Sequence, residues 1–216
     1  MTTPRTATTF VVWGFLVLAS LSPVLVSAGD KGNWPSFRGL GAAGVMEGVD
    51  LPEQWDVATG QGMRFKVEVP GLAHSSPVIW GERLFVTTAV SSERGASFKP
   101  GLYGSGEASP DRSAHEWQIR CIDKRSGKPL WEKTVTRGSP KDKRHIKSTY
   151  ANATPATDGE HVVALFGSEG LFCLTVAGEL LWRKDLGRMD VGAYDLPSYE
   201  WGAASSPIIH AGKVIV

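Results

Sequence analysis

The sequence predicts an all-β fold built from repeated units of four short antiparallel strands, on three observations. A phrase of cysteine, glycine turn and tryptophan occurs twice, as CIDKRSGKPLW from residue 121 and as CLTVAGELLW from residue 173. Three other stretches share a proline followed by two β-rich runs around a turn. No amphipathic helical pattern follows residue 28, so strands are the elements that the periodicity supports.

Each of the three proline-containing stretches is predicted to be a hairpin. They read HSSPVIWGERLFVTT from residue 74, NATPATDGEHVVALF from residue 152 and ASSPIIHAGKVIV from residue 204. Their turns, Gly81-Glu82, Asp158-Gly159 and Ala211-Gly212, lie between β-rich runs, which is typical of a hairpin. The proline suits the first position of a strand, where its missing N–H breaks no ladder bond.

The tryptophan phrase adds a second hairpin to the first two of these stretches. The result is a four-stranded unit over residues 74–136, with a loop insertion rich in Gly, Ser and Pro at residues 91–115. A second unit covers residues 152–187, and residues 204–216 supply the opening hairpin of a third. Sequence repeats of this size indicate a repetitive architecture rather than one mixed sheet.

Two segments precede the first unit. Residues 29–62 are predicted to be an extended arm. Residues 63–69, MRFKVEV, have the character of an outer strand, with Phe65 where a docking tryptophan would stand. In a closed ring such a strand completes the last unit and joins the two ends.

The repeats predict a β-propeller in which each unit is one blade. A small sheet cannot bury both faces alone, so it must stack on its neighbours. Trp131 and Trp182, next to turns at Gly127 and Gly178, are predicted to pack between blades. Propellers close with about four to eight blades, and the sequence contains about two and a half. This predicts an incomplete ring, the chain being an N-terminal fragment of a propeller of about seven or eight blades.

The first 28 residues are predicted to be an export signal. Arg5 is followed by an apolar run over residues 10–26 and by a small-residue cleavage site ending at Ala28. A membrane anchor is the alternative, and the run is at the short limit for a span. We therefore expect a periplasmic or extracellular protein with no stable membrane span after cleavage.

Charge and cysteine content exclude some partner classes. Of 23 basic residues only Arg5 lies in the signal, which leaves 22 bases against 22 acids. A neutral chain has no global field to attract nucleic acid. The basic run at residues 141–147 is interpreted as a solvated loop, with a phosphate-binding patch as the alternative. Cys121 and Cys173 occupy equivalent slots of two units, so free buried thiols are expected rather than a disulfide.

The first tryptophan phrase resembles the tryptophan-docking motif of the pyrroloquinoline-quinone (PQQ) repeat. Asp123, Ser126, Gly127 and Trp131 match that pattern directly, and the shorter second copy carries over Gly178 and Trp182. The stretch NWPSFRG at residues 33–39 is similar to the start of exported bacterial proteins with PQQ-like propellers. The resemblance covers the chain after the signal.

The resemblance implies two functions. The first is a non-catalytic binding or scaffold module for a protein or small-molecule partner at the propeller face. The alternative is a PQQ- and calcium-dependent oxidoreductase acting on alcohols or sugars. Its large members carry an adjacent cysteine pair and a Glu/Asn/Asp calcium set, and neither can be assigned in this sequence. No catalytic residue or metal ligand is therefore predicted.

Candidate ligand-binding residues come from the segments that enter each innermost strand, because those segments line one mouth of a propeller's channel. Aromatic, amide and ionisable groups that converge there could hold a ligand. The alternative is structural, with the His and Asn capping strand ends and the aromatic residues filling the packing between blades. The candidates are His74, Lys147, Tyr150, Asn152, Glu200 and Trp201.

Overall fold

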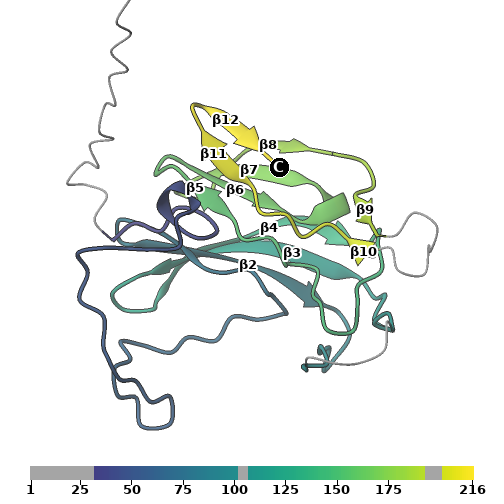
Figure 1. The fold of residues 1–216 in the computed structure, drawn as a ribbon. Helices are drawn as coiled ribbons and strands as arrows, with labels where there is room; N and C mark the ends of the chain where they lie inside the picture. The colour runs from purple at the N-terminus through teal and green to yellow at the C-terminus, as the bar shows by residue number, and fades with distance from the viewer. Residues whose placement is uncertain (1–31, 102–106, 193–200) are drawn as a thin grey trace, which may run out of the picture. The chain divides into compact units, whose positions relative to one another are not determined.

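Two four-stranded antiparallel sheets and a two-stranded hairpin follow one another along the chain (Figure 1). The structure is a computed structural model and describes residues 32–101, 107–192 and 201–216. The predicted export signal, residues 102–106 of the loop insertion and Glu200 lie outside the described residues. Within the described ranges, no helix has the length and apolar character needed to cross a membrane.

The first sheet has the strand order β1-β2-β3-β4. Its strands are β1 (Val78–Trp80), β2 (Arg83–Ser91), β3 (His115–Asp123) and β4 (Pro129–Gly138). Two-sided burial favours the β-branched and aromatic residues of β2 and β3. The two long strands pair from end to end, and the insertion connects them.

The second sheet repeats this arrangement in the order β5-β6-β7-β8. Its strands are β5 (Ala156–Thr157), β6 (His161–Leu165), β7 (Leu171–Thr175) and β8 (Leu180–Lys184). A single 3-10 turn, η3 (Gly167–Glu169), replaces the long insertion between the middle strands. The all-β prediction of four-stranded antiparallel units is therefore confirmed, and neither sheet closes on itself.

Smaller elements complete the described chain. β11 (Ile208–His210) and β12 (Lys213–Ile215) form a hairpin within residues 204–216, where the opening hairpin of a third unit was expected. Strands β9 (Asp190–Val191) and β10 (Trp201–Gly202) form a short ribbon before it. The 3-10 turn η2 (Leu40–Ala42) lies in the N-terminal arm. No strand forms over residues 63–69, where an outer strand was expected, because a strand requires a ladder partner and none lies beside this segment in the described structure.

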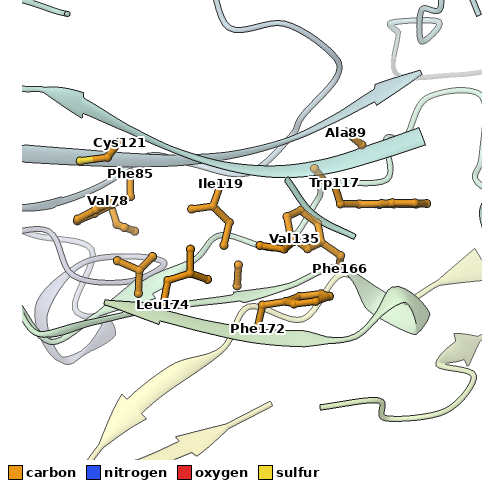
Figure 2. Packing of buried hydrophobic residues seen from close by; sticks show 13 residues of the cluster. Val78, Phe85, Ala89, Trp117, Ile119, Cys121, Val135, Phe166, Phe172 and Leu174 are labelled. Atoms are coloured by element: carbon orange, nitrogen blue, oxygen red, sulfur yellow. The ribbon is translucent and has the colours of Figure 1, made fainter. Parts of the chain in front are cut away.

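Alternating side chains from both sheets build one shared core (Figure 2). Strand period two places every second residue of β2 and β3 on the face toward the second sheet. Phe85 and Ile119 on the first sheet meet Phe172 and Leu174 on the second, and all four are buried. The interface between the sheets is therefore apolar and buried.

The opposite face of the second sheet forms a second apolar layer. Val163, Leu165 and Cys173 lie on that face, and Ile209 and Val214 of the β11–β12 hairpin pack against them. The hairpin thus sits on the second sheet, on the face away from the first.

The repeated tryptophan phrase has a consistent geometry in both sheets. Cys121 pairs across the ladder with Trp131, and Cys173 pairs with Trp182. In each sheet the register shifts immediately after that cysteine. A bulge of this kind bends the outer strand and fixes the direction of its side chains. The recurrence of a cysteine with a tryptophan ten residues later in the first copy and nine in the second therefore reflects one type of ladder pair.

Trp131 docks on the glycine turn of the next sheet. Its Nε1–H donates to the backbone oxygen of Val176 at 3.0 Å, and its ring covers Gly178. A Cβ at Gly178 would lie 2.8 Å from that ring, and the residue has φ +93°, so only glycine fits this turn without strain. Phe65 covers Gly127 of the first sheet in the same way, with 2.6 Å to an added Cβ.

Trp182 lies in a different environment. Its side chain is 40% exposed and borders a cavity of about 130 Å³ beside the β11–β12 hairpin. Within the described residues, no glycine turn lies on its indole as Gly178 lies on Trp131. The two equivalent tryptophans thus differ in burial because only the first has a four-stranded neighbour to dock on.

The turns beside the docking glycines are held by the residue in the acidic slot. Asp123 Oδ1 accepts hydrogen bonds from the backbone of Arg125 and Ser126 and from the Ser126 hydroxyl. These bonds lower the pKa of Asp123, and the bond from the Ser126 hydroxyl has the largest effect. In the second copy, the Thr175 hydroxyl accepts from the Glu179 N–H at 3.1 Å. A hydroxyl thus replaces part of the carboxylate's role.

Hydroxyl residues before the prolines link consecutive units. The Ser76 N–H donates to Thr154 Oγ1, and the Thr154 N–H donates to Ser206 Oγ, both at 3.0 Å. Ser76, Thr154 and Ser206 are the residues before the three repeated prolines. The first strands also follow this series, since β5 contacts both β1 and β11. We call this chain of bonds the hydroxyl relay.

Candidate functional site

A small cavity lies where the segment entering β5 meets the connections on either side of it. Its walls come from residues 142–145, 148–150 and 152–153, from residues 165–169 at the end of β6 and in the turn that follows it, and from residues 201–203. The cavity measures about 60 Å³, room for about two water molecules or one small polar group. Three of the sequence-predicted candidates, Tyr150, Asn152 and Trp201, line it.

His74 and Lys147 do not line the cavity. The ring of His74 meets Phe98 edge-on, at 4.8 Å between ring centroids, and the backbone N–H of His74 donates to the backbone oxygen of Ala151. The Lys147 N–H donates to Nδ1 of His145 inside a turn. Glu200 lies outside the described residues. His74 and Lys147 therefore shape the loops around the cavity without forming its wall.

Trp201 forms the aromatic wall. The β9–β10 pairing fixes its backbone opposite Val191. The ring of His145 meets the indole edge-on at 5.0 Å, and the Lys143 Nζ lies 5.0 Å from the indole centroid. A cation this close to an indole face is attracted by the ring quadrupole. The indole thus holds a positive charge at the cavity rim.

Asn152 holds the turn that leads into β5. Its Oδ1 accepts from the Thr149 N–H and hydroxyl, and its Nδ2 donates to the Ser148 hydroxyl. These bonds close one tight loop over residues 148–152. The amide is therefore a positioning group for the cavity wall, as in the structural alternative for this residue.

Tyr150 carries a buried phenol. Its ring meets His115 edge-on at 4.9 Å, and the Arg144 guanidinium lies 5.6 Å from its centroid. Within the described chain, its Oη is buried and has no hydrogen-bond partner. Desolvation raises the pKa of Tyr150, although nearby Arg112 and Arg144 act in the opposite direction. The phenol therefore stays protonated and can donate to a ligand or a water molecule.

The basic run at residues 141–147 is not a solvated loop, and that interpretation is wrong for its central residues. Asp142 and Arg144 are 7% and 3% exposed. Asp142 accepts a short hydrogen bond from the Ser168 hydroxyl and pairs with Arg188 at 3.1 Å. The partners lie far along the chain, so the local charge pattern of the run could not identify them.

Arg144 is a buried cation with neutral hydrogen-bond partners. Its guanidinium donates to the backbone oxygens of Ser148 and Ser97 at 2.7 and 3.1 Å. Among the described residues, no carboxylate lies within ion-pair distance of it. Desolvation lowers its pKa from the usual arginine value, and an arginine remains charged under all ordinary conditions. The Asp111 carboxylate acts on the guanidinium through space and raises its pKa, so the positive charge at the cavity is offset in part but forms no ion pair with a described carboxylate.

The two acids of the cavity wall are already engaged. Asp142 is bonded to Ser168 and Arg188. Glu169 Oε1 accepts from the Lys141 N–H at 2.7 Å, and desolvation raises the pKa of Glu169. Neither acid lies within ion-pair distance of Arg144, so the cavity wall holds two engaged carboxyl groups and a guanidinium that is not ion-paired with either of them.

The cavity does not fit the calcium and PQQ of the oxidoreductase alternative. Across the parts of the chain that the structure describes, no three His, Cys, Asp or Glu side chains gather as metal ligands. Cofactor sites occupy about 300–1,000 Å³, far more than this cavity. A wider hollow of about 500 Å³ lies between residues 93–97 and 109–113, at the base of the insertion, and Ser97 and Ser109 of its wall are hydrogen-bonded to Arg144.

Both cysteines are free and buried, as expected from their equivalent positions. Desolvation raises the pKa of each thiol to about 11. A raised pKa lowers the thiolate fraction at any given pH, because burial disfavours the charged form. Cys121 lies in the core between the two four-stranded sheets, and Cys173 lies in the layer between the second sheet and the β11–β12 hairpin. The two sulfurs are therefore in separate layers.

We expect both thiols to be almost inert toward Ellman's reagent in the folded chain. At pH 8 the thiolate fraction is about two hundredfold smaller for a pKa of 11 than for an ordinary cysteine. Labelling should therefore be at least that much slower in buffer than in concentrated urea, where both thiols react. Fast labelling of the folded chain would contradict the buried positions.

Comparisons with protein-family models and with curated proteins find no match to this chain.

Proposed function

We propose that the chain is built as a β-propeller of the exported PQQ-like type and acts as a non-catalytic binding module. Its partner would be a protein that presents an acidic side chain to the cavity at Arg144 and Trp201. With the export signal predicted at residues 1–28, this binding takes place in the periplasm or outside the cell.

Repetition of the contacts between units supports the propeller. Phe65 covers Gly127 as Trp131 covers Gly178. At the first strands of the units, the hydroxyl relay and the contacts of β5 with β1 and β11 also repeat from one unit to the next. A contact repeated head to tail gives a ring when its rotation closes. Stacked four-stranded blades are the arrangement in which a ring buries such sheets.

The buried guanidinium of Arg144 is the observation that carries the binding proposal. A buried charge is costly unless it is paired, and the hydrogen-bond acceptors of Arg144 among the described residues are the backbone oxygens of Ser148 and Ser97. The Lys143 ammonium above Trp201 adds positive potential at the rim. A carboxylate is small enough for the cavity of about 60 Å³ and forms strong charge-assisted hydrogen bonds with arginine.

Two short peptides test this proposal on the full chain. In a ¹⁵N-labelled sample, Ala-Ala-Glu-Ala-Ala is expected to shift the indole N–H signal of Trp201, with a Kd of about 1 mM, typical of one exposed contact. Ala-Ala-Gln-Ala-Ala, which lacks the charge, should leave the signal in place. Arg144→Gln should abolish the shift, and Trp55→Phe in the exposed arm is the matched control.

Several outcomes would contradict the proposal. Equal shifts with both peptides would remove the charge argument, and no shift would remove the site. If Arg144→Gln unfolds the chain, as circular dichroism would show, Lys143→Gln provides the second variant. Addition of PQQ and Ca²⁺ tests the alternative, because dye-linked alcohol oxidation by the purified chain would support an oxidoreductase instead.

A further inference from the structure

The first strand of each sheet is an edge strand, and residues 33–39 lie along both edges. We call these residues the edge segment. β1 and β5 each have a sheet neighbour on one side only. Unpaired edges offer free N–H and C=O groups to any extended chain, so the partner of these edges determines what else can bind there.

The edge segment satisfies the outward groups of β1. The Trp34 N–H donates to the Ile79 oxygen at 2.8 Å, and the Ile79 N–H donates to the Trp34 oxygen at 2.9 Å. The Gly81 N–H donates to Oδ1 of Asn33 at 2.8 Å. Ile79 is the central residue of this three-residue strand, and both of its outward groups are therefore occupied.

The same segment reaches the second sheet. The Thr157 N–H of β5 donates to the Pro35 oxygen at 2.8 Å. Two edges from different sheets are thus joined by one extended stretch. Proline cannot donate to a ladder, but at this position only its oxygen is needed.

The edge segment also has a defined shape of its own. The Ser36 oxygen accepts from the Gly39 N–H at 2.8 Å, and the Ser36 hydroxyl donates to the Gly39 oxygen. The ring of Trp34 lies on Gly39, where an added Cβ would be 2.7 Å from it. A preformed turn lowers the ordering cost of binding, so this segment is organised as a ligand for the two edges.

The arm that follows is exposed and locally bonded. Leu51, Trp55 and Val57 are 76%, 70% and 61% exposed. Within the described structure, backbone hydrogen bonds of residues 40–62 go to the arm itself, such as Asp56 with Gln61, or to Arg38 and Gly39 at the end of the edge segment, and none goes to a sheet. The edge segment is therefore tied to its own sheets through a long and weakly held connection.

We propose that the edges of β1 and β5 form a peptide-binding site that accepts the edge segment of a second copy of this chain. The site adds an extended strand to a sheet edge, with main-chain bonds for affinity and the Asn33 and Trp34 side chains for selectivity. The chain's own segment is the resident occupant. Exchange of identical segments through a long connection is a low-cost route to a dimer. This proposal does not rest on the acidic-ligand function.

Disulfide trapping tests the exchange directly. Trp34 and Ile79 form an antiparallel pair, whose Cα separation of about 5.5 Å suits a disulfide. Full chain carrying Trp34→Cys is mixed with full chain carrying Ile79→Cys and a different tag, under mild oxidation. A covalent heterodimer is expected. Native Cys121 and Cys173, buried with pKa values of about 11, contribute little background.

Concentration sets the size of the effect. The connection gives the resident segment an effective concentration of about 1 mM. At about 0.1 mM chain, roughly a tenth of the sites should hold the segment of another copy. Excess synthetic peptide of residues 32–44 should suppress the heterodimer, and a peptide of the same residues in scrambled order should not. Trp55→Cys mixed with Ile79→Cys is the matched control without trapping.

One further variant makes every outcome decisive. Trp34→Cys with Ile79→Cys in one chain should close an intramolecular disulfide in dilute solution. If it closes while no heterodimer forms, the edge binds only its own segment and the proposal is wrong. If it does not close, the segment does not dock on β1, which also overturns the proposal. Trapping by Trp55→Cys equal to that by Trp34→Cys would show random collision instead.

Discussion

Replacement of Trp131 by alanine is expected to lower the free energy of unfolding by about 3 kcal/mol, the low end for a buried tryptophan. The indole fills the space over Gly178, donates to the Val176 oxygen and packs 6.0 Å from Phe85. Its loss removes an apolar contact between the two sheets and leaves the Val176 oxygen without that donor. The loss therefore weakens the interface itself, and not only the sheet that carries the residue.

Urea titration followed by far-UV circular dichroism measures this effect. Trp182→Ala is the matched control, because the same residue in the equivalent strand is 40% exposed. It should lower the free energy of unfolding by about 1 kcal/mol or less. Trp131→Phe should recover part of the loss, since Phe65 already packs on a glycine turn in this chain. Equal effects of the two alanine variants would contradict the docking role of Trp131.

Thr154→Val is expected to lower the free energy of unfolding by about 2 kcal/mol. Valine keeps the shape of threonine but removes the oxygen that accepts the Ser76 N–H. Thr154 is 2% exposed, so water cannot readily replace this acceptor. An unsatisfied buried donor costs about 1–3 kcal/mol. The loss should act between units, because donor and acceptor belong to different sheets.

The conservative variant Thr154→Ser separates the hydrogen bond from packing. Serine retains the acceptor and should recover most of the stability that valine loses. Native-state hydrogen exchange gives a second measurement, since the Ser76 amide should exchange faster in Thr154→Val than in Thr154→Ser. The hydroxyl relay would have no energetic role if the valine chain were as stable as the original.

The strand pattern could be predicted from the sequence because its signals are local. Period-two alternation and turn dipeptides located the hairpins at Gly81 and Gly159 to within a few residues. The outer strand expected at residues 63–69 could not be settled this way, since a strand also requires a neighbour. Phe65 nevertheless lies on the turn at Gly127 as a docking residue does. The sequence therefore predicted the docking position of Phe65 although it did not predict the backbone conformation of residues 63–69.

The cavity could be predicted only in part. The position of Tyr150 and Trp201 at the entry to first strands identified two of its walls. Asp142, by contrast, stands in a basic run, and its partners Ser168 and Arg188 are 26 and 46 residues away. Pairings at that range depend on how the sheets stack. Local charge therefore misled the interpretation of residues 141–147, although the sequence contained every residue of the network.

The relay of hydroxyls along the first strands has a consequence for how the described chain comes apart. Each unit contacts the next through an apolar layer and through one hydroxyl bond, so stability depends on contacts between neighbours, as in a one-dimensional array. A destabilising substitution in the second sheet weakens its contacts with both the first sheet and the β11–β12 hairpin, while one in the hairpin leaves the two sheets joined. At equal burial of the altered side chain, substitutions should therefore be tolerated better in the first sheet or in the β11–β12 hairpin than in the second sheet.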